Sequence, residues 1–151
     1  MSSAQALQAL LRQGGEIDTP ASQEAVMQAA TETGLTALVV DCDRARSRSA
    51  VLRAVAKAVD FPEFFGSNLD ALYDCLSDTV MDQRDGLFLW FHRLHTGDPI
   101  LGDDARAVLQ VCQDVVEFAE NNGRVFSYVV EHAGKHPDPV VEQPVSQPDD
   151  D

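Results

Sequence analysis

Residues 61–81 read FPEFFGSNLDALYDCLSDTVM and carry the most informative pattern of the chain. An aromatic segment, FPEFFG, leads into a predicted helix in which Asp70, Asp74 and Asp78 follow one another at intervals of four residues. Residues four apart share one face of a helix, so the three carboxylates form a row. The apolar residues of the helix fall on roughly the opposite face and should enter the core; they are Leu69, Leu72, Leu76 and Val80.

The acidic row costs helix stability, because like charges four residues apart destabilise a helix by about a few tenths of a kcal/mol per pair. A row formed at a cost suggests a use, and a merely solvated helix face is the alternative explanation. The aromatic residues before the helix also allow two interpretations, burial in the core or exposure at an interface. Phe61 and Phe65 are expected in the core, whereas Phe64, beside Glu63 and Gly66, has the composition of a protein-interface hot spot.

Charge is the outlying property of the whole chain. Its 151 residues include 25 acidic and 11 basic side chains, for a net charge of −14. Residues 137–151 hold five carboxylates, four prolines and no basic residue, which predicts a disordered acidic tail. The remaining 136 residues still carry 20 acidic and 11 basic side chains. Nucleic acid is therefore not expected as a partner, and basic surfaces are; solubility alone is the alternative explanation of the charge.

Hydrophobic periodicity and stop signals predict the remaining elements. Helices are expected at 3–13, 22–34, 49–60 and 103–121, and apolar strands at 35–41, 87–94 and 124–131. Strands that alternate with helices indicate an α/β fold with a small parallel sheet. We expect an N-terminal helical extension at 1–34, a central domain at 35–133 and the disordered tail at 134–151. The extension could pack on the sheet, mediate self-association or shield the surface.

Other features of the sequence argue against an enzyme or a membrane protein. Cys42, Cys75 and Cys112 are far apart in apolar segments, which indicates buried reduced thiols and a cytoplasmic protein. His92 and His95 have no third ligand at metal-binding spacing, and no nucleotide-binding or nucleophile motif occurs. The sequence shows neither a signal peptide nor a transmembrane segment. We therefore expect no cofactor, no metal and no membrane association.

The run FPEFFGSNLDALYDCL resembles the signature of the barstar family, inhibitors of barnase-type ribonucleases, which has the form PEYYG-x-NLDALWDCL. The resemblance spans roughly residues 35–131. It implies a barstar-like fold with a three-stranded parallel sheet packed with helices. It also implies an intracellular inhibitor, in effect an immunity protein, that plugs the cationic cleft of a basic extracellular or toxin-type ribonuclease with the acidic helix and its preceding loop.

The resemblance also assigns roles to individual residues. Asp74 is implied as the central carboxylate that replaces the scissile phosphate, with Asp70 in support and Phe64 stacked on a nuclease side chain. The resemblance implies that further residues shape or border the contact, namely Gly66, Asn68, Tyr73, Ser77, Asp78 and, on the later helix, Asp114.

Three positions depart from the family pattern. Phe64 lacks the usual tyrosine hydroxyl, Thr79 stands where an aromatic residue is common, and Asp114 replaces the usual glutamate. The sequence therefore indicates the mode of binding more strongly than the identity of the nuclease. A barstar-like adaptor that binds another basic protein remains the alternative to a ribonuclease inhibitor.

Overall fold

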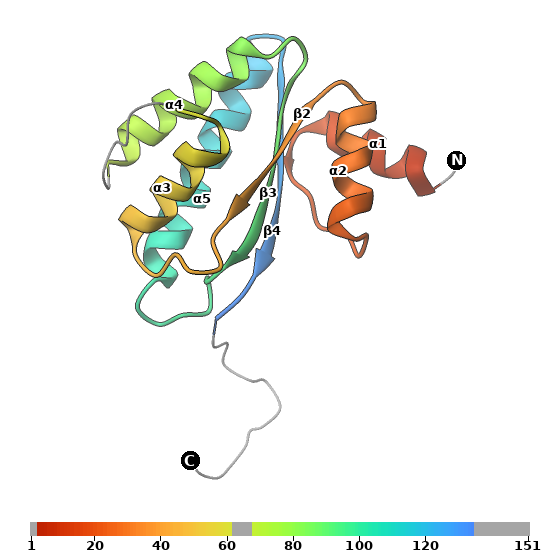
Figure 1. Ribbon diagram of the computed structural model, residues 1–151. Helices are drawn as coiled ribbons and strands as arrows, with labels where there is room; N and C mark the ends of the chain where they lie inside the picture. Colours follow the sequence, from red (N-terminus) through yellow and green to blue (C-terminus); the bar gives the residue numbers. More distant parts are fainter. Residues whose placement is uncertain (1–2, 62–67, 135–151) are drawn as a thin grey trace.

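The computed structural model describes residues 3–61 and 68–134, which form a parallel sheet covered by helices on both faces (Figure 1). The described elements are α1 (Ser3–Gln13), β1 (Gly15–Glu16), α2 (Gln23–Glu32), β2 (Thr36–Asp41), α3 (Arg48–Ala58), α4 (Leu69–Asp82), β3 (Gly86–Leu94), α5 (Gly102–Asn121) and β4 (Val125–His132). The predicted helices and the three predicted strands are confirmed, with bounds that differ by a few residues. The predicted tail from residue 135 onward lies outside the described residues.

The sheet has the strand order β1-β4-β3-β2, and all of its pairings are parallel. The prediction of three strands is therefore wrong. The fourth strand, β1, pairs Gly15 with Ser127 and Glu16 with Tyr128 at the edge of β4. Two residues are too few to show the alternation that marks a strand in sequence. Gly14, just before β1, and Gly15, its first residue, have φ of 82° and 87°, which lets the chain leave α1 and turn directly onto the sheet.

Helices α3, α4 and α5 cover one face of the sheet, and α1 with α2 covers the other (Figure 1). The order of the strands explains this division. From β2 to β3 to β4 the chain moves across the sheet in one direction, whereas from β1 to β2 it moves back. Crossovers between parallel strands are almost always right-handed, so a reversal of direction places the connecting helix on the opposite face. The reversal places α2, and α1, which precedes β1, packs against α2 and β4 on the same face. The N-terminal helices thus pack on the sheet, the first of the three roles left open by the sequence.

Each face of the sheet has its own hydrophobic core. On the α3–α5 side, residues such as Leu52, Leu76 and Phe91 are fully buried. On the α1–α2 side, Leu11 and Val26 pack against a second cluster; its strand residues include Phe88, Trp90 and Val129. Alternate residues of β3 enter opposite cores, as expected for a strand covered on both faces. Because buried residues of α4 and of β3 share the core on the α3–α5 side, packing against the sheet fixes the position of α4 in the fold.

Candidate functional site

Asn68 determines where α4 begins. Its side-chain oxygen accepts hydrogen bonds from the backbone N–H groups of Asp70, at 2.9 Å, and Ala71, at 3.2 Å. These bonds satisfy two N–H groups that the first turn of a helix otherwise leaves without partners. Asp70 lies in that first turn, where a carboxylate is favoured by the positive end of the helix. The cap thus fixes the start and the direction of the acidic helix.

The two faces of α4 separate as the sequence predicts. Leu72, Leu76 and Val80 are completely buried against the sheet and neighbouring helices. The three aspartates at 70, 74 and 78 are exposed on the other side. Within the described part of the chain, none of the three forms an ion pair. The helix therefore presents a row of uncompensated carboxylates on a rigid support.

Tyr73 joins α4 to α5 beside this row. Its ring packs edge-on against Phe118 of α5, with ring centroids 6.2 Å apart and an interplanar angle of 76°. Asp114 precedes Phe118 by four residues, so it lies one turn away on the same side of α5. The Asp114 carboxylate is exposed and accepts a hydrogen bond from Gln110 Nε2 at 3.3 Å. The structure thus places a carboxylate of α5 on the side of that helix that contacts α4.

Three other candidate residues fall elsewhere. Phe64 and Gly66 lie outside the described residues. Ser77 lies on the inner side of α4 with only 5% of its surface exposed. Its hydroxyl oxygen is buried and has no hydrogen-bond partner among the residues that the structure describes.

Replacing Ser77 by alanine is expected to leave the free energy of unfolding unchanged or to raise it by up to about 1 kcal/mol, because the change removes a buried hydroxyl that is not hydrogen-bonded. Binding of a protein partner is expected to change by less than about threefold. Urea denaturation and titration calorimetry measure the two quantities. A loss of affinity much larger than this, without a loss of stability, would show that the hydroxyl reaches the partner.

The cysteines are unsuited to nucleophilic chemistry. All three are buried and unpaired, as predicted. Burial raises the pKa of the Cys75 thiol to about 11 and that of Cys42 to about 12, and it also raises the pKa of Cys112. At neutral pH these thiols are therefore protonated, whereas the reactive form of cysteine is the thiolate. Cys75 faces the core from the helix that carries the acidic row, and so contributes packing there.

The histidines of the β3 end have structural partners. His95 is 1% exposed, and its Nε2 donates to the backbone oxygen of Asp43 at 2.7 Å, which ties the loop after β2 to the end of β3. His92 Nδ1 lies 2.9 Å from Glu131 Oε1, which also accepts a hydrogen bond from the Trp90 indole. Sequence spacing gave no sign of the contact between His92 and Glu131. The two residues are 39 positions apart and approach each other only through the pairing of β3 with β4.

The residues that the structure describes contain no cluster of three or more histidine, cysteine or acidic side chains arranged to hold a metal ion. Among the same residues, no helix has the length and apolar character needed to cross a membrane. The exposed aspartates of α4 form a negatively charged surface. Carboxylates in such an arrangement are able to bind a cationic surface.

A comparison with protein families identifies a match over most of the described central region. The model of the family described as Barstar (barnase inhibitor) matches residues 35–131. This segment begins before β2 and ends within β4, so it includes the capped acidic helix and α5 but not α1, β1 or α2. It covers well over half of the chain. Together with the parallel sheet and the exposed carboxylates of α4, this match confirms the resemblance seen in the sequence, and the chain belongs to the Barstar family of barnase inhibitors.

Proposed function

We propose that this protein inhibits a ribonuclease by inserting the acidic face of α4 into the cleft that binds RNA. The observation that carries the proposal is the row of three exposed aspartates, without ion pairs to described residues, on a capped helix of a Barstar family member. A ribonuclease must hold a phosphate group and therefore presents a cationic cleft. A row of carboxylates is complementary to that cleft, and the inhibitor itself needs no catalytic group.

Asp74 occupies the middle of the row, one helical turn from each of the other two aspartates. We infer that its carboxylate takes the place of the scissile phosphate among the basic residues of the nuclease. Asp70 would then support it, and Asp78 would border the contact. Charges at the centre of an interface are desolvated and contribute more to affinity than charges at the rim.

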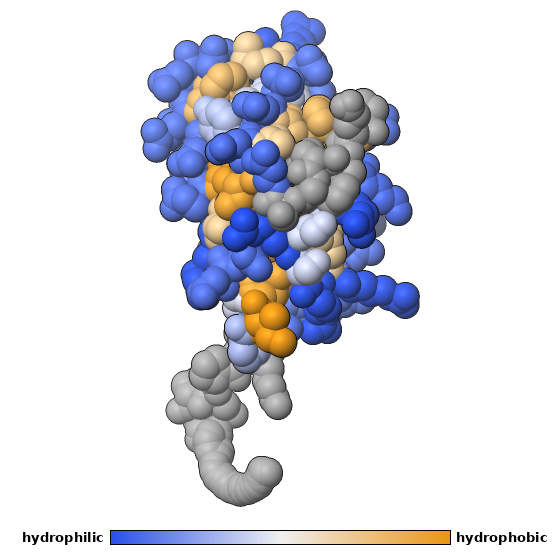
Figure 2. Space-filling view, turned by 90° about the vertical axis from the view of Figure 1, so that its left-hand side faces the viewer, coloured by the Kyte–Doolittle hydropathy of each residue, from blue (hydrophilic) through white to orange (hydrophobic). Residues whose placement is uncertain are grey.

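Other residues would shape the rim of the contact. Asn68 fixes the start of α4, Tyr73 anchors it to α5, and Asp114 adds a carboxylate on the α4 side of α5. Phe64 and Gly66, on the segment before α4, remain candidates for contact with the nuclease, and Ser77 would border it from its buried position. Figure 2 looks onto the side of the molecule that α3–α5 cover, and hydrophilic residues occupy most of it.

The departures from the family pattern bear on the partner. Phe64 cannot donate the hydroxyl hydrogen bond of a tyrosine, and Asp114 is shorter by one methylene than a glutamate. We infer that the partner is a basic extracellular or toxin-type ribonuclease whose surface differs from that of barnase at these contacts. The inhibitor would act in the cytoplasm of the cell that makes the nuclease.

The proposal is tested by affinity capture from the cells that produce the protein, with the full chain as bait, followed by mass spectrometry. The expected capture is a small basic nuclease, and the purified chain should block its cleavage of RNA at equimolar concentration. The association rate should fall as salt increases, because screening weakens attraction between the charged surfaces. Capture of a basic protein without nuclease activity would favour the adaptor alternative, and undiminished cleavage of RNA in the complex would exclude inhibition.

A further inference from the structure

One segment of this acidic chain is strongly basic. Residues 44–57, RARSRSAVLRAVAK, hold five of the 11 basic residues and none of the 25 acidic ones. They form the end of the loop after β2 and most of α3. We call the three exposed cations of this segment that line a common hollow, Arg44, Arg53 and Lys57, the α3 basic patch.

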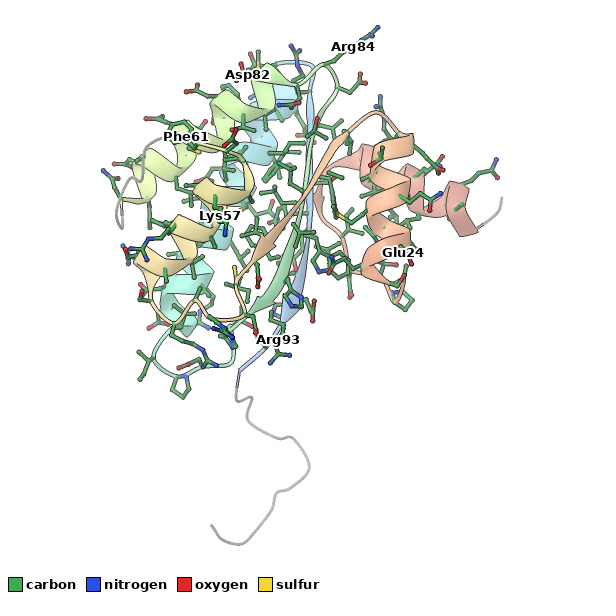
Figure 3. All side chains as sticks on the ribbon, viewed as in Figure 1. Glu24, Lys57, Phe61, Asp82, Arg84 and Arg93 are labelled. Atoms are coloured by element: carbon green, nitrogen blue, oxygen red, sulfur yellow. The ribbon has the colours of Figure 1, made fainter. Side chains whose placement is uncertain are left out.

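The α3 basic patch surrounds a hollow of about 270 Å³ between the loop and the helix. Arg53 and Lys57 are one helical turn apart on α3, and Arg44 reaches the hollow from the loop. Lys57 lies along α3 in Figure 3, well away from Asp82 and Arg84 at the far end of α4. The remaining wall consists mainly of alanine side chains, Ala45, Ala50 and Ala54, which are small enough to let an extended chain approach.

Neighbouring carboxylates neutralise only part of this basic segment. Arg46 pairs with Asp98 at 3.3 Å, and Arg48 pairs with Asp104 at 2.9 Å. Arg44 and Lys57, by contrast, form no ion pair with any residue of the described ranges 3–61 and 68–134. Two cations of the patch are therefore available to an anionic ligand.

Two aspartates also line the hollow, and their partners matter. Asp43 Oδ1 lies 2.7 Å from Arg93 Nε, and this guanidinium holds the pKa of Asp43 below its usual range. Asp41 accepts a hydrogen bond from the backbone N–H of Asp43 at 3.1 Å. The lining of the hollow therefore holds two carboxylates, Asp41 and Asp43, against the three cations of the patch, and Asp43 is already paired with Arg93. The lining thus carries net positive charge.

The last described residue, Gly134, lies near the N-terminal end of the basic segment 44–57. The backbone of Gly134 packs so tightly on Gly97 and Asp98 that an added Cβ would lie 2.7 Å from the Asp98 nitrogen. Asp98 in turn pairs with Arg46, at the N-terminal end of the basic segment. Seventeen residues follow Gly134. A flexible chain of that length has a typical end-to-end distance of about 20–25 Å, and α3 with its 11 residues is about 16 Å long.

We propose that residues 137–151, PDPVVEQPVSQPDDD, bind to the α3 basic patch of the same molecule. The segment has the complementary charge, with carboxylates at Asp138, Glu142, Asp149, Asp150 and Asp151 and no basic residue. Its attachment next to Arg46 gives it an effective concentration of about a millimolar or more at the patch, which an untethered ligand must match. Its prolines favour an extended chain, which fits a shallow hollow lined by alanines.

The same observations disfavour other occupants. Nucleic acid would approach a chain of net charge −14, so long-range repulsion opposes its binding. The acidic face of α4 from a second copy could also reach the α3 basic patch, but only as an untethered ligand. Occupation by the chain's own C-terminal segment would close the patch to such a copy.

A spin label on the C-terminal segment tests the proposal. The full chain with Ser146→Cys can be labelled selectively, because the three native thiols are buried and have raised pKa values. Paramagnetic broadening is expected for backbone amides of residues 44–57 and should disappear in about 1 M salt, where the screening length is about 3 Å. It should fall at least several-fold in Arg44→Gln/Lys57→Gln.

The matched control is Arg12→Gln/Arg84→Gln, which removes two exposed cations outside the patch and should retain the broadening. Broadening that is weak everywhere, or strongest on α1 and α2, would overturn the proposal. A mixture of spin-labelled protein without isotope enrichment and isotope-enriched protein without the spin label distinguishes binding within one molecule from binding between two copies. If that mixture reproduces the broadening, the occupant is a second copy and the proposal is wrong.

Discussion

Replacing Asp74 by alanine is expected to weaken binding of the proposed ribonuclease partner by about 30-fold to several thousand-fold. This corresponds to about 2–5 kcal/mol, a range whose best-known examples include the barnase–barstar complex itself, so it is carried over from the family. The physical reason is that truncation leaves the basic residues of the cleft buried without their anionic partner. Titration calorimetry or inhibition of RNA cleavage measures the loss.

The fold itself should tolerate this change. Asp74 is exposed, and its removal relieves repulsion from the aspartates four residues before and after it, worth about a few tenths of a kcal/mol each. Asp82→Ala is the matched control, because Asp82 is an exposed carboxylate at the last residue of the same helix (Figure 3). It should change affinity by less than about threefold. Equal effects of the two substitutions would mean that α4 contributes only general charge and that Asp74 is not central.

Replacing Gly86 by alanine is expected to lower the free energy of unfolding by about 3 kcal/mol or more, which for a domain of this size lowers Tm by roughly 10 °C. Gly86 begins β3 with φ of 145°, a conformation that L-residues rarely adopt. A Cβ at this position would lie 1.9 Å from the backbone oxygen of Val125, its partner in β4. The clash is with backbone, so two central strands would have to separate locally. Thermal unfolding followed by circular dichroism measures the effect.

Gly123→Ala separates the clash from the cost of a positive φ. Gly123 has φ of 69°, but a Cβ there would meet no atom within 4 Å. Its replacement should therefore cost only about 1 kcal/mol. If both variants lose the same stability, the close approach of β3 and β4 at Gly86 does not limit the fold.

Local patterns account for the correct predictions. The bounds of α2 follow from Ser22, which caps its start, and from the turn at Gly34, where φ is 95°. The exposed face of α4 could also be predicted from local sequence, because aspartates and leucines at helical spacing must point in opposite directions. Such signals lie within about four residues of the element they define, so no knowledge of the rest of the chain is needed.

The features that the sequence did not predict depend on contacts between segments far apart in the chain. The family resemblance implied that Ser77 borders the contact with the partner, yet the packing of α4 buries its hydroxyl. The strand β1 exists only because β4 offers an edge about 110 residues later, with Ile17 donating to the Tyr128 oxygen at 2.8 Å. Sequence spacing likewise gives no indication that Gly134 and Arg46 both contact Asp98.

The sequence by itself determined the helices, the three long strands, the acidic row and the family. The tertiary structure alone decided the fourth strand, the division of the helices between the two faces and the convergence of Gly134 with Asp98 and Arg46. The physical reason is the range of the interactions. Periodicity and capping act between neighbours along the chain, whereas strand order and the packing of loops are fixed by burial of surfaces that the sequence keeps far apart.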